Sequence, residues 1–227
     1  MRYIQRLKDL RRRLKRYNDI HIKKDEFMKN IYKWQDDRGD QTLRLSYPLD
    51  LNSLVFDVGG YIGNFAADIF CKYNCNIYIF EPVTEFYEKV KARFSNNPKV
   101  KVFHAGLSDR SSAAKISING TSSSVFNTNS ENTEEIKFIS VVDFINDHGI
   151  KKIDLMKINI EGGEYSLLDS LIEHDFLDIT RYYQIQFHKF IPDAKEKRGN
   201  IRTELSKTHR LFWDYPFVWE SWGKKEN

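Results

Sequence analysis

The sequence predicts an α/β fold with a mostly parallel, doubly wound sheet, and three observations lead to this prediction. From residue 51 onward, short apolar runs alternate with amphipathic stretches, which is typical of parallel strands joined by crossover helices. The chain has 227 residues, of which 41% are hydrophobic, so it can form a full core and is not globally disordered. No apolar run approaches the roughly 20 residues that a transmembrane helix needs.

The first 50 residues are predicted to be a helical extension, and residues 51–227 to be the body. Helices are expected over 1–17 and 26–34. The first helix carries one narrow apolar stripe, formed by Ile4, Leu7, Leu10, Leu14 and Tyr17. Residues 1–20 hold eight Lys and Arg against two Asp, a net charge of +6, so the rest of this +4 chain is at −2. We expect the helix to pack on the body or to form a homodimer, ahead of lying on an anionic membrane surface.

The elements of the body follow in order from their periodicity and their turn residues. Five parallel strands are predicted, over 54–58, 76–81, 99–104, 153–160 and 181–188. Four helices are predicted between and after them, over 64–72, 85–94, 165–173 and 194–209. An antiparallel pair, 114–119 and 136–141, encloses a loop rich in Ser, Thr and Asn. Two aromatic strands, 211–215 and 217–222, turn at Pro216 and give the sheet an antiparallel C-terminal edge.

The strongest local motif is the run DVGGYIG at 57–63, between the first strand and its helix. Gly59 and Gly63 allow a tight turn and a close approach of the backbone to a ligand. The run does not fit the dinucleotide pattern GxGxxG, which favours a smaller ligand. Asp57 could hold an amino group, and Glu81 at the end of the second strand could bind a ribose hydroxyl pair. The alternative is a plain strand exit with a helix cap.

Five runs, in consistent order between residues 51 and 190, resemble the motifs of S-adenosylmethionine-dependent methyltransferases of the FkbM type. They are DVGGYIG at 57–63, FEP at 80–82, AGLSD at 105–109, SSS at 122–124 and IDLMKINIEGGE at 153–164. The resemblance implies a Rossmann-like methyltransferase fold, S-adenosylmethionine as cofactor, and O-methylation of hydroxyls in natural products and surface polysaccharides. It also implies the cofactor-binding residues: Asp57, Gly59 and Gly63 at the methionine end, Glu81 at the ribose, and Ser108 with Asp109 at the adenine.

Two positions depart from the family pattern. Tyr61 stands where motif I usually has Asn or Gly, and Asn159 replaces the hallmark acidic residue after the fourth strand. Asn159 keeps open the alternative of a catalytically inactive binding module that retains the cofactor fold. A nucleic-acid methyltransferase is disfavoured by the acidic body and by the absence of an NPPY-type motif after the fourth strand.

Candidate catalytic residues follow the fourth and fifth strands, at the edge where open α/β sheets bind ligands. Lys157 and Glu161 share one face of the fourth strand by its period of two. The fifth strand delivers Gln184, Gln186 and His188. We expect His188 to accept a proton from an alcohol, with Glu161 orienting the histidine or the acceptor. A divalent metal held by Glu161 and His188 is an alternative.

Structural alternatives stand beside these assignments. Lys157, Glu161 and Glu164 could cap the next helix, and His188 could be a hydrogen-bonded core histidine. The basic residues of the 194–209 helix could meet the diphosphate of a nucleotide sugar or simply be solvated; they are Lys195, Lys197, Arg198 and Arg202. Among the C-terminal aromatics, Phe217 and Trp219 are expected to be buried.

The sequence therefore predicts an S-adenosylmethionine-dependent O-methyltransferase that acts on a sugar hydroxyl of a nucleotide sugar or a surface-polysaccharide unit. A methyltransferase of a non-sugar natural product is the nearest alternative. Cys71 and Cys75 are the only cysteines and no secretion signal is recognised, so we expect reduced thiols and a cytoplasmic protein. Because the body is mildly acidic, we expect no nucleic-acid partner.

Overall fold

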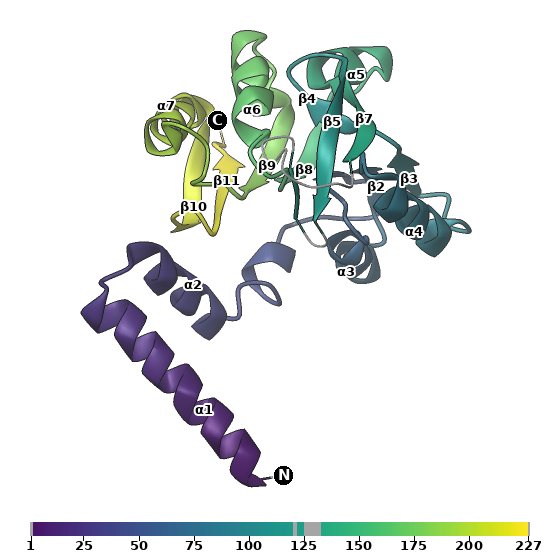
Figure 1. The fold of residues 1–227 in the computed structure, drawn as a ribbon. Coiled ribbons are helices and arrows are strands. Elements are labelled where there is room, and N and C mark those ends of the chain that lie inside the picture. The colour runs from purple at the N-terminus through teal and green to yellow at the C-terminus, as the bar shows by residue number, and fades with distance from the viewer. Residues whose placement is uncertain (1, 120–121, 125–132, 227) are drawn as a thin grey trace.

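The computed structural model describes residues 2–119, 122–124 and 133–226, and within them the predicted α/β sheet is confirmed (Figure 1). Seven of the described strands form one sheet in the order β10-β11-β9-β8-β1-β2-β3. Its parallel strands are β1 (Leu54–Val58), β2 (Asn76–Phe80), β3 (Val100–Phe103), β8 (Ile153–Ile158) and β9 (Thr180–Ile185). The antiparallel edge consists of β10 (His209–Tyr215) and β11 (Trp219–Lys224), as expected.

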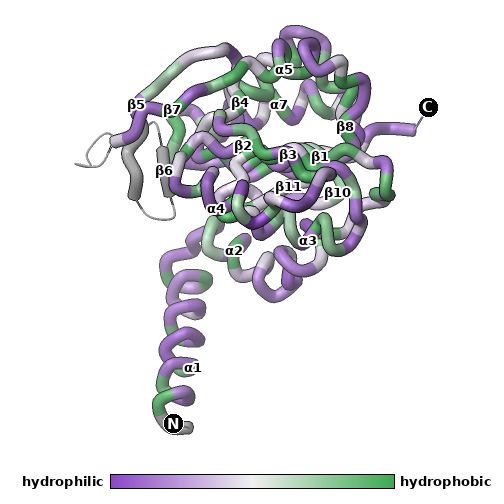
Figure 2. The backbone as a smooth tube through the Cα atoms, turned by 90° about the vertical axis from the view of Figure 1, so that its right-hand side faces the viewer, coloured by the Kyte–Doolittle hydropathy of each residue, from purple (hydrophilic) through white to green (hydrophobic). Residues whose placement is uncertain are grey.

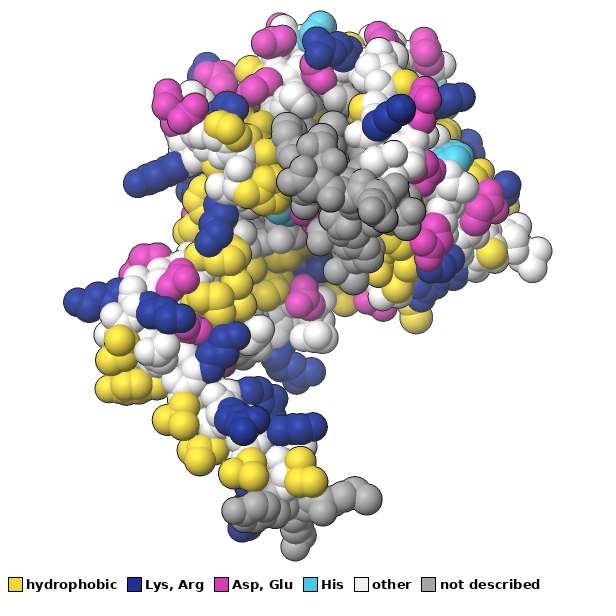
Figure 3. Space-filling model, in the orientation of Figure 1, with side chains coloured by type: hydrophobic (Ala, Val, Ile, Leu, Met, Phe, Trp, Pro, Cys, Tyr) yellow, Lys and Arg dark blue, Asp and Glu magenta, His cyan; other side chains and the backbone are white. Residues whose placement is uncertain are grey.

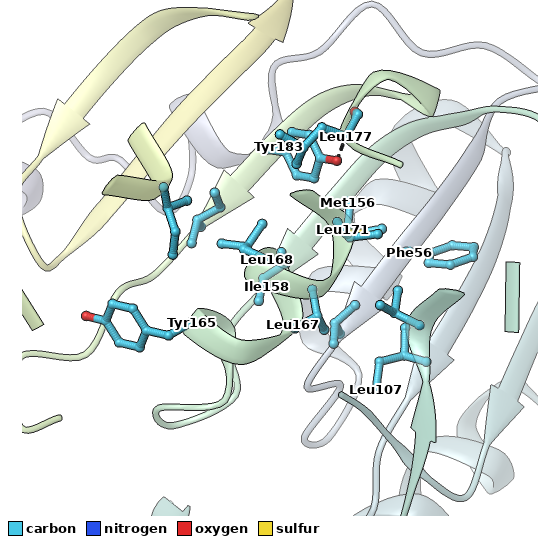
Figure 4. Packing of buried hydrophobic residues seen from close by; sticks show 14 of the residues in the cluster. Phe56, Leu107, Met156, Ile158, Tyr165, Leu167, Leu168, Leu171, Leu177 and Tyr183 are labelled. Atoms are coloured by element: carbon cyan, nitrogen blue, oxygen red, sulfur yellow. Dashed lines mark hydrogen bonds between the residues drawn. The ribbon is translucent and has the colours of Figure 1, made fainter. Parts of the chain in front are cut away.

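Helices cover both faces of this sheet. The side chains of the central strands alternate between the two faces, so each face has its own hydrophobic core. The helices are α3 (Asn64–Tyr73), α4 (Thr84–Phe94), α5 (Val141–Asp147), α6 (Glu164–Glu173) and α7 (Ala194–Thr208). Phe56 and Met156 belong to the core under α5, α6 and α7, part of which Figure 4 shows. Val55 and Leu155 belong to the core under α3 and α4. Figure 2 colours the chain by hydropathy and shows that the central strands are mostly hydrophobic, whereas helix α1 is mostly hydrophilic.

A second sheet has the order β4-β7-β5-β6, with strands β4 (Gly106–Ser108), β5 (Ser112–Asn119), β6 (Ser122–Ser124) and β7 (Thr133–Ser140). The antiparallel pairing of β5 with β7 was predicted, whereas β4 and β6 were not. The strand predicted over 136–141 is also too long at its end. The Ser140 side chain accepts a hydrogen bond from the Asp143 N–H and starts α5, a helix that the sequence analysis did not predict.

The N-terminal helices are confirmed as α1 (Arg2–Tyr17) and α2 (Glu26–Asp36), joined by a short π-helical turn, Asn18–Ile22. Helix α1 projects away from the body (Figure 1), and its stripe is exposed instead of packed on the body. Helix α2 packs against the β10–β11 turn, where Trp34 joins a buried cluster with Tyr215 and Trp219. Among the described residues, no helix combines the length and the apolar character that crossing a bilayer takes.

The basic residues of α7 divide into two groups. Arg198 and Arg202 form ion pairs with Asp214 and Glu220, which tie α7 to the C-terminal strands. Lys195 and Lys197 are exposed. The two arginines are therefore paired within the fold instead of forming a solvated face, and their contact with a substrate diphosphate stays a prediction. Of the C-terminal aromatics, Trp219 is buried as expected and Phe217 is half-buried.

Candidate active site

A cavity of about 440 Å³ lies at the carboxyl ends of β1, β2 and β8. Five of the predicted site residues line it: Gly59, Glu81, Ser108, Asp109 and Glu161. The second sheet closes the opposite side through residues of β5 and β7, namely Ser112, Ala114, Ile136 and Phe138. Apolar side chains fill in between, namely Phe80, Val83, Phe86 and Leu107. The cavity thus combines an apolar wall with three carboxylates, at the edge of the sheet where the sequence predicted a ligand site.

The turn after β1 is pressed between its two neighbouring strands. The Gly59 N–H donates to the carbonyl of Phe80 at 3.0 Å, and a Cβ added to Gly59 would lie 2.0 Å from the backbone oxygen of Asn159. Gly59 has φ +85° and Gly63, which caps α3, has φ +77°. Only glycine combines such angles with such close packing at low cost. The motif at 57–63 therefore places bare backbone at the floor of the cavity.

Asp57 and Lys157 form a buried ion pair next to this turn. The Lys157 Nζ donates to Asp57 Oδ1 at 2.8 Å and to the Gly59 carbonyl at 2.6 Å. Burial lowers the pKa of Lys157, although the neighbouring Asp57 charge opposes that shift. Asp57 Oδ2 is buried and makes no hydrogen bond to any part of the chain that the structure describes. Neither side chain lines the cavity, and the hydrogen bond from Lys157 to the Gly59 carbonyl holds the turn in place from behind.

Glu81 is 5% exposed and lies at the cavity wall at the end of β2. Its Oε2 accepts a hydrogen bond from the Tyr61 N–H at 2.7 Å and its Oε1 from the Val83 N–H at 3.0 Å. Burial raises the pKa of Glu81 to about 7, although the two N–H groups favour the charged form. Tyr61 itself has φ 49°, so the family departure is accommodated in left-handed backbone whose N–H holds Glu81.

Ser108 and Asp109 face the cavity from the end of β4. The Ser108 hydroxyl donates to Asp109 Oδ1 at 2.8 Å. Arg110 follows and also lines the cavity, with Nε 4.0 Å from Asp109 Oδ2. The resemblance assigned Ser108 and Asp109 to the adenine of the cofactor, and the structure brings them to the same cavity as Gly59 and Glu81.

His188 lies between two carboxylates behind the cavity wall. Its Nδ1 is 3.1 Å from Glu164 Oε1, and its Nε2 is 3.5 Å from Glu161 Oε2. Burial alone would lower the pKa of His188, but the hydrogen bonds and charges of both glutamates outweigh burial and raise this pKa to about 9. Glu164 also accepts the N–H groups of His188 and Gly162. His188 therefore carries a proton at neutral pH, and of these three residues only Glu161 lines the cavity.

The structure also brings together residues that the sequence analysis did not consider. Gln184 was expected to face the site, but its Nε2 donates to the Arg44 carbonyl at 2.9 Å and to the Tyr47 hydroxyl at 3.0 Å. Arg44 returns a hydrogen bond to Gln184 Oε1 at 3.0 Å and lies over the Trp219 ring. Arg44 and Tyr47 belong to no motif, and they lie in the stretch that was assigned to the helical extension and not to the body.

The residues at and directly behind the cavity fit S-adenosylmethionine. Asn159 lines the cavity and Asp57 lies behind the turn, and Asn159 Oδ1 and Asp57 Oδ2 are buried acceptors without a partner among the described residues, which suits the amino group of a ligand. The bare backbone at Gly59 permits close approach, and Glu81 offers a carboxylate in the place expected for a ribose. A metal finds less support. Within the described ranges, no group of three or more His, Cys, Asp or Glu has the arrangement of a metal site.

Comparisons with known proteins relate the chain to methyltransferases. The family model of the methyltransferase FkbM domain matches residues 57–215. The hexuronic acid methyltransferase AglP of Haloferax volcanii is 24% identical over 213 residues, which cover 88% of this chain and 83% of that protein.

Two solved structures share the fold. One, a candidate methyltransferase from Streptococcus mutans in complex with SAH, has a TM-score of 0.52 at 12% identity and covers 84% of this chain and 97% of its own. The other, a candidate rRNA-methylase from Clostridium thermocellum, has a TM-score of 0.53 at 8% identity and covers 84% and 95%. Because the family model spans most of the chain, the protein belongs to the FkbM methyltransferase family.

Proposed function

We propose that this methyltransferase uses S-adenosylmethionine to methylate a sugar hydroxyl, on a nucleotide sugar or on a surface-polysaccharide unit. The observation that carries the proposal is the Glu161 carboxylate, which lines the cavity beside the turn at Gly59 and is backed by His188. A hexuronic acid is the first acceptor to test, since a relative over most of the chain is named for that substrate. Arg110 at the same cavity could meet the acceptor's carboxylate.

The chain's own residues would hold the cofactor at defined points of the cavity. We assign the amino group to the side of Asp57, the close backbone approach to Gly59 and Gly63, and the ribose to Glu81. Ser108 and Asp109 would meet the adenine. When bound, S-adenosylmethionine supplies an activated methyl group for in-line transfer, so that placing the acceptor correctly accounts for much of the acceleration.

An alcohol acceptor also has to lose its proton. Glu161 reaches the cavity, whereas His188 lies behind it and already carries a proton on each ring nitrogen at neutral pH. We therefore assign proton acceptance to Glu161 and the orientation of Glu161 to the His188 imidazolium. This reverses the two roles that the sequence analysis assigned. Asn159 then does not deprive the site of a base, because Glu161 on the same loop provides the carboxylate.

The decisive experiment is a transfer assay with labelled S-adenosylmethionine and matched acceptors. The panel contains a uronic acid nucleotide such as UDP-glucuronate, its neutral counterpart UDP-glucose, an oligosaccharide with hexuronic units, a non-sugar alcohol and RNA. Each reaction runs with and without a chelator. We expect methyl transfer to a saccharide, at a rate that the chelator does not change. The variant Glu161→Gln should lose this transfer but retain its affinity for the cofactor.

Three other results would contradict the proposal. Cofactor binding without transfer to any acceptor would favour the inactive binding module. Transfer to RNA or to the non-sugar alcohol alone would give the enzyme another substrate class. Turnover lost with the chelator and restored by a divalent ion would support the metal alternative over Glu161 as an unaided base.

A further inference from the structure

Helix α1 carries an apolar stripe that nothing in the described chain covers. Its members are exposed to between 44% and 60% and are Ile4, Leu7, Leu10, Leu14 and Tyr17. Figure 3 shows these hydrophobic side chains along one side of the projecting helix. The helix is nevertheless held at its C-terminal end. Arg16 pairs with Asp36 of α2, and the Tyr32 hydroxyl donates to Asp19 at 2.8 Å.

Cations border the stripe on both sides. With 3.6 residues per turn, Arg6 and Arg13 fall along one border of the stripe, and Lys8, Arg11 and Lys15 fall along the other. The helix contains a single acidic residue, Asp9, which already pairs with Arg12. Long basic side chains beside an apolar face can bury their methylene groups and keep their charges at a polar boundary.

This charge pattern decides between the possible partners of α1. A second copy of α1 would bring its own flanking cations against these, and Asp9 is the only acid that the helix could offer in return. RNA would match the cations but leave the apolar stripe exposed to water. An anionic phospholipid surface matches both, because the stripe enters the acyl boundary while the cations meet the headgroups.

We propose that α1 lies in the interface of an anionic phospholipid membrane and anchors the protein there. Helix α2, which follows α1, contacts the body close to His188. The Nζ of Lys189, the next residue in the chain, lies 3.9 Å from the centre of the Phe27 ring. Membrane binding by α1 does not depend on the identity of the acceptor.

Vesicle sedimentation of the full chain tests the anchor without any activity assay. The probes are vesicles of phosphatidylcholine alone and of phosphatidylcholine with about one third phosphatidylglycerol. We expect binding to the anionic vesicles, at least about tenfold weaker binding to the neutral ones, and loss of binding at about 0.5 M salt. The variant Leu7→Ser/Leu14→Ser should release the protein. Arg6→Gln/Arg11→Gln/Arg13→Gln should weaken binding by about fivefold for each charge removed.

Gln5→Ser, on the polar face of the same helix, is the matched control and should bind like the parent chain. All four proteins should unfold at the same temperature, because the changed side chains are exposed and lie outside the core. Equal binding to both vesicle types, or binding unaffected by Leu7→Ser/Leu14→Ser, would overturn the proposal. So would a dimer in solution that the leucine variant converts to a monomer while the parent ignores vesicles, which would restore the homodimer that the sequence predicted.

Discussion

Lys157 on β8 donates a hydrogen bond to Asp57 on β1 across 2.8 Å, and both side chains are almost completely buried. The two residues are direct register partners in the parallel pair, so the ion pair joins the two strands whose ends form the cavity floor. Removing one partner of a buried pair leaves an uncompensated charge, which costs far more than losing an exposed pair.

We expect Lys157→Met to lower the free energy of unfolding by about 3–5 kcal/mol. The double variant Lys157→Met/Asp57→Leu should lose much less than the sum of the two single variants, because no unpaired charge remains. Chemical denaturation measures all three. Lys152→Met is the control: its side chain is 62% exposed beside Asp154, and it should cost at most about 1 kcal/mol. Additive losses would contradict a coupled pair.

Cofactor affinity should depend on the protonation of Glu81. Because burial raises the pKa of Glu81 to about 7, much of this carboxyl is protonated below neutrality in the ligand-free protein. A ribose hydroxyl pair binds best to the charged carboxylate, so S-adenosylhomocysteine should bind more tightly at about pH 8 than at about pH 6. Isothermal titration calorimetry measures the difference. Glu81→Gln should bind weakly at both values, and an unchanged pH dependence in that variant would exclude Glu81 as its source.

Stability in alkaline solution should depend on His188. Its pKa is raised from 6.5 to about 9, so the stability that its proton contributes is fully present below 6.5 and is lost as the pH rises through 9. The difference across this window is on the order of 3 kcal/mol. We expect the free energy of unfolding of the parent chain to fall by more than that of His188→Gln between these values. Parallel pH curves would show that Glu161 and Glu164 do not stabilise the protonated form of His188.

Turnover should distinguish the two candidate bases. If Glu161 accepts the proton while the His188 imidazolium orients it, the rate stays level around neutrality and falls as the pH passes through about 9. If neutral His188 were the base, the rate would rise toward that value. We expect Glu161→Gln to lose at least about a hundredfold in kcat. His188→Gln should lose less and lose the alkaline limb of the profile, whereas a purely structural His188 would leave the profile unchanged.

The turn at Gly59 should tolerate no side chain. Gly59→Ala places a Cβ 2.0 Å from the Asn159 carbonyl in backbone with φ +85°, so the turn must move. We expect the free energy of unfolding to fall by about 1–3 kcal/mol and the affinity for S-adenosylhomocysteine to fall clearly. Gly199→Ala in α7 is the matched control, since nothing lies within 4 Å of its added Cβ. That change should leave the affinity unchanged and add up to about 1 kcal/mol of stability.

The sequence by itself determined the class of sheet, its five parallel strands, four of the helices that cover it, and the turn at 57–63. These features rest on local periodicity and on glycines and acids within a few residues of one another. It missed β4, β6 and α5. Strands β4 and β6 are only three residues long and are defined by partners elsewhere in the chain. Helix α5 begins at Val141, which the pattern assigned to the end of the strand predicted over 136–141.

Only the tertiary structure decided how the site residues are partnered. It turned Gln184 toward Arg44 and Tyr47, engaged Arg198 and Arg202 with Asp214 and Glu220, and enclosed His188 between two carboxylates. These pairings join residues up to 140 positions apart, and no local pattern encodes them. Their physical consequence is a matter of burial and charge. A histidine near one carboxylate could be a base, but one held between two keeps its proton and leaves the cavity to Glu161.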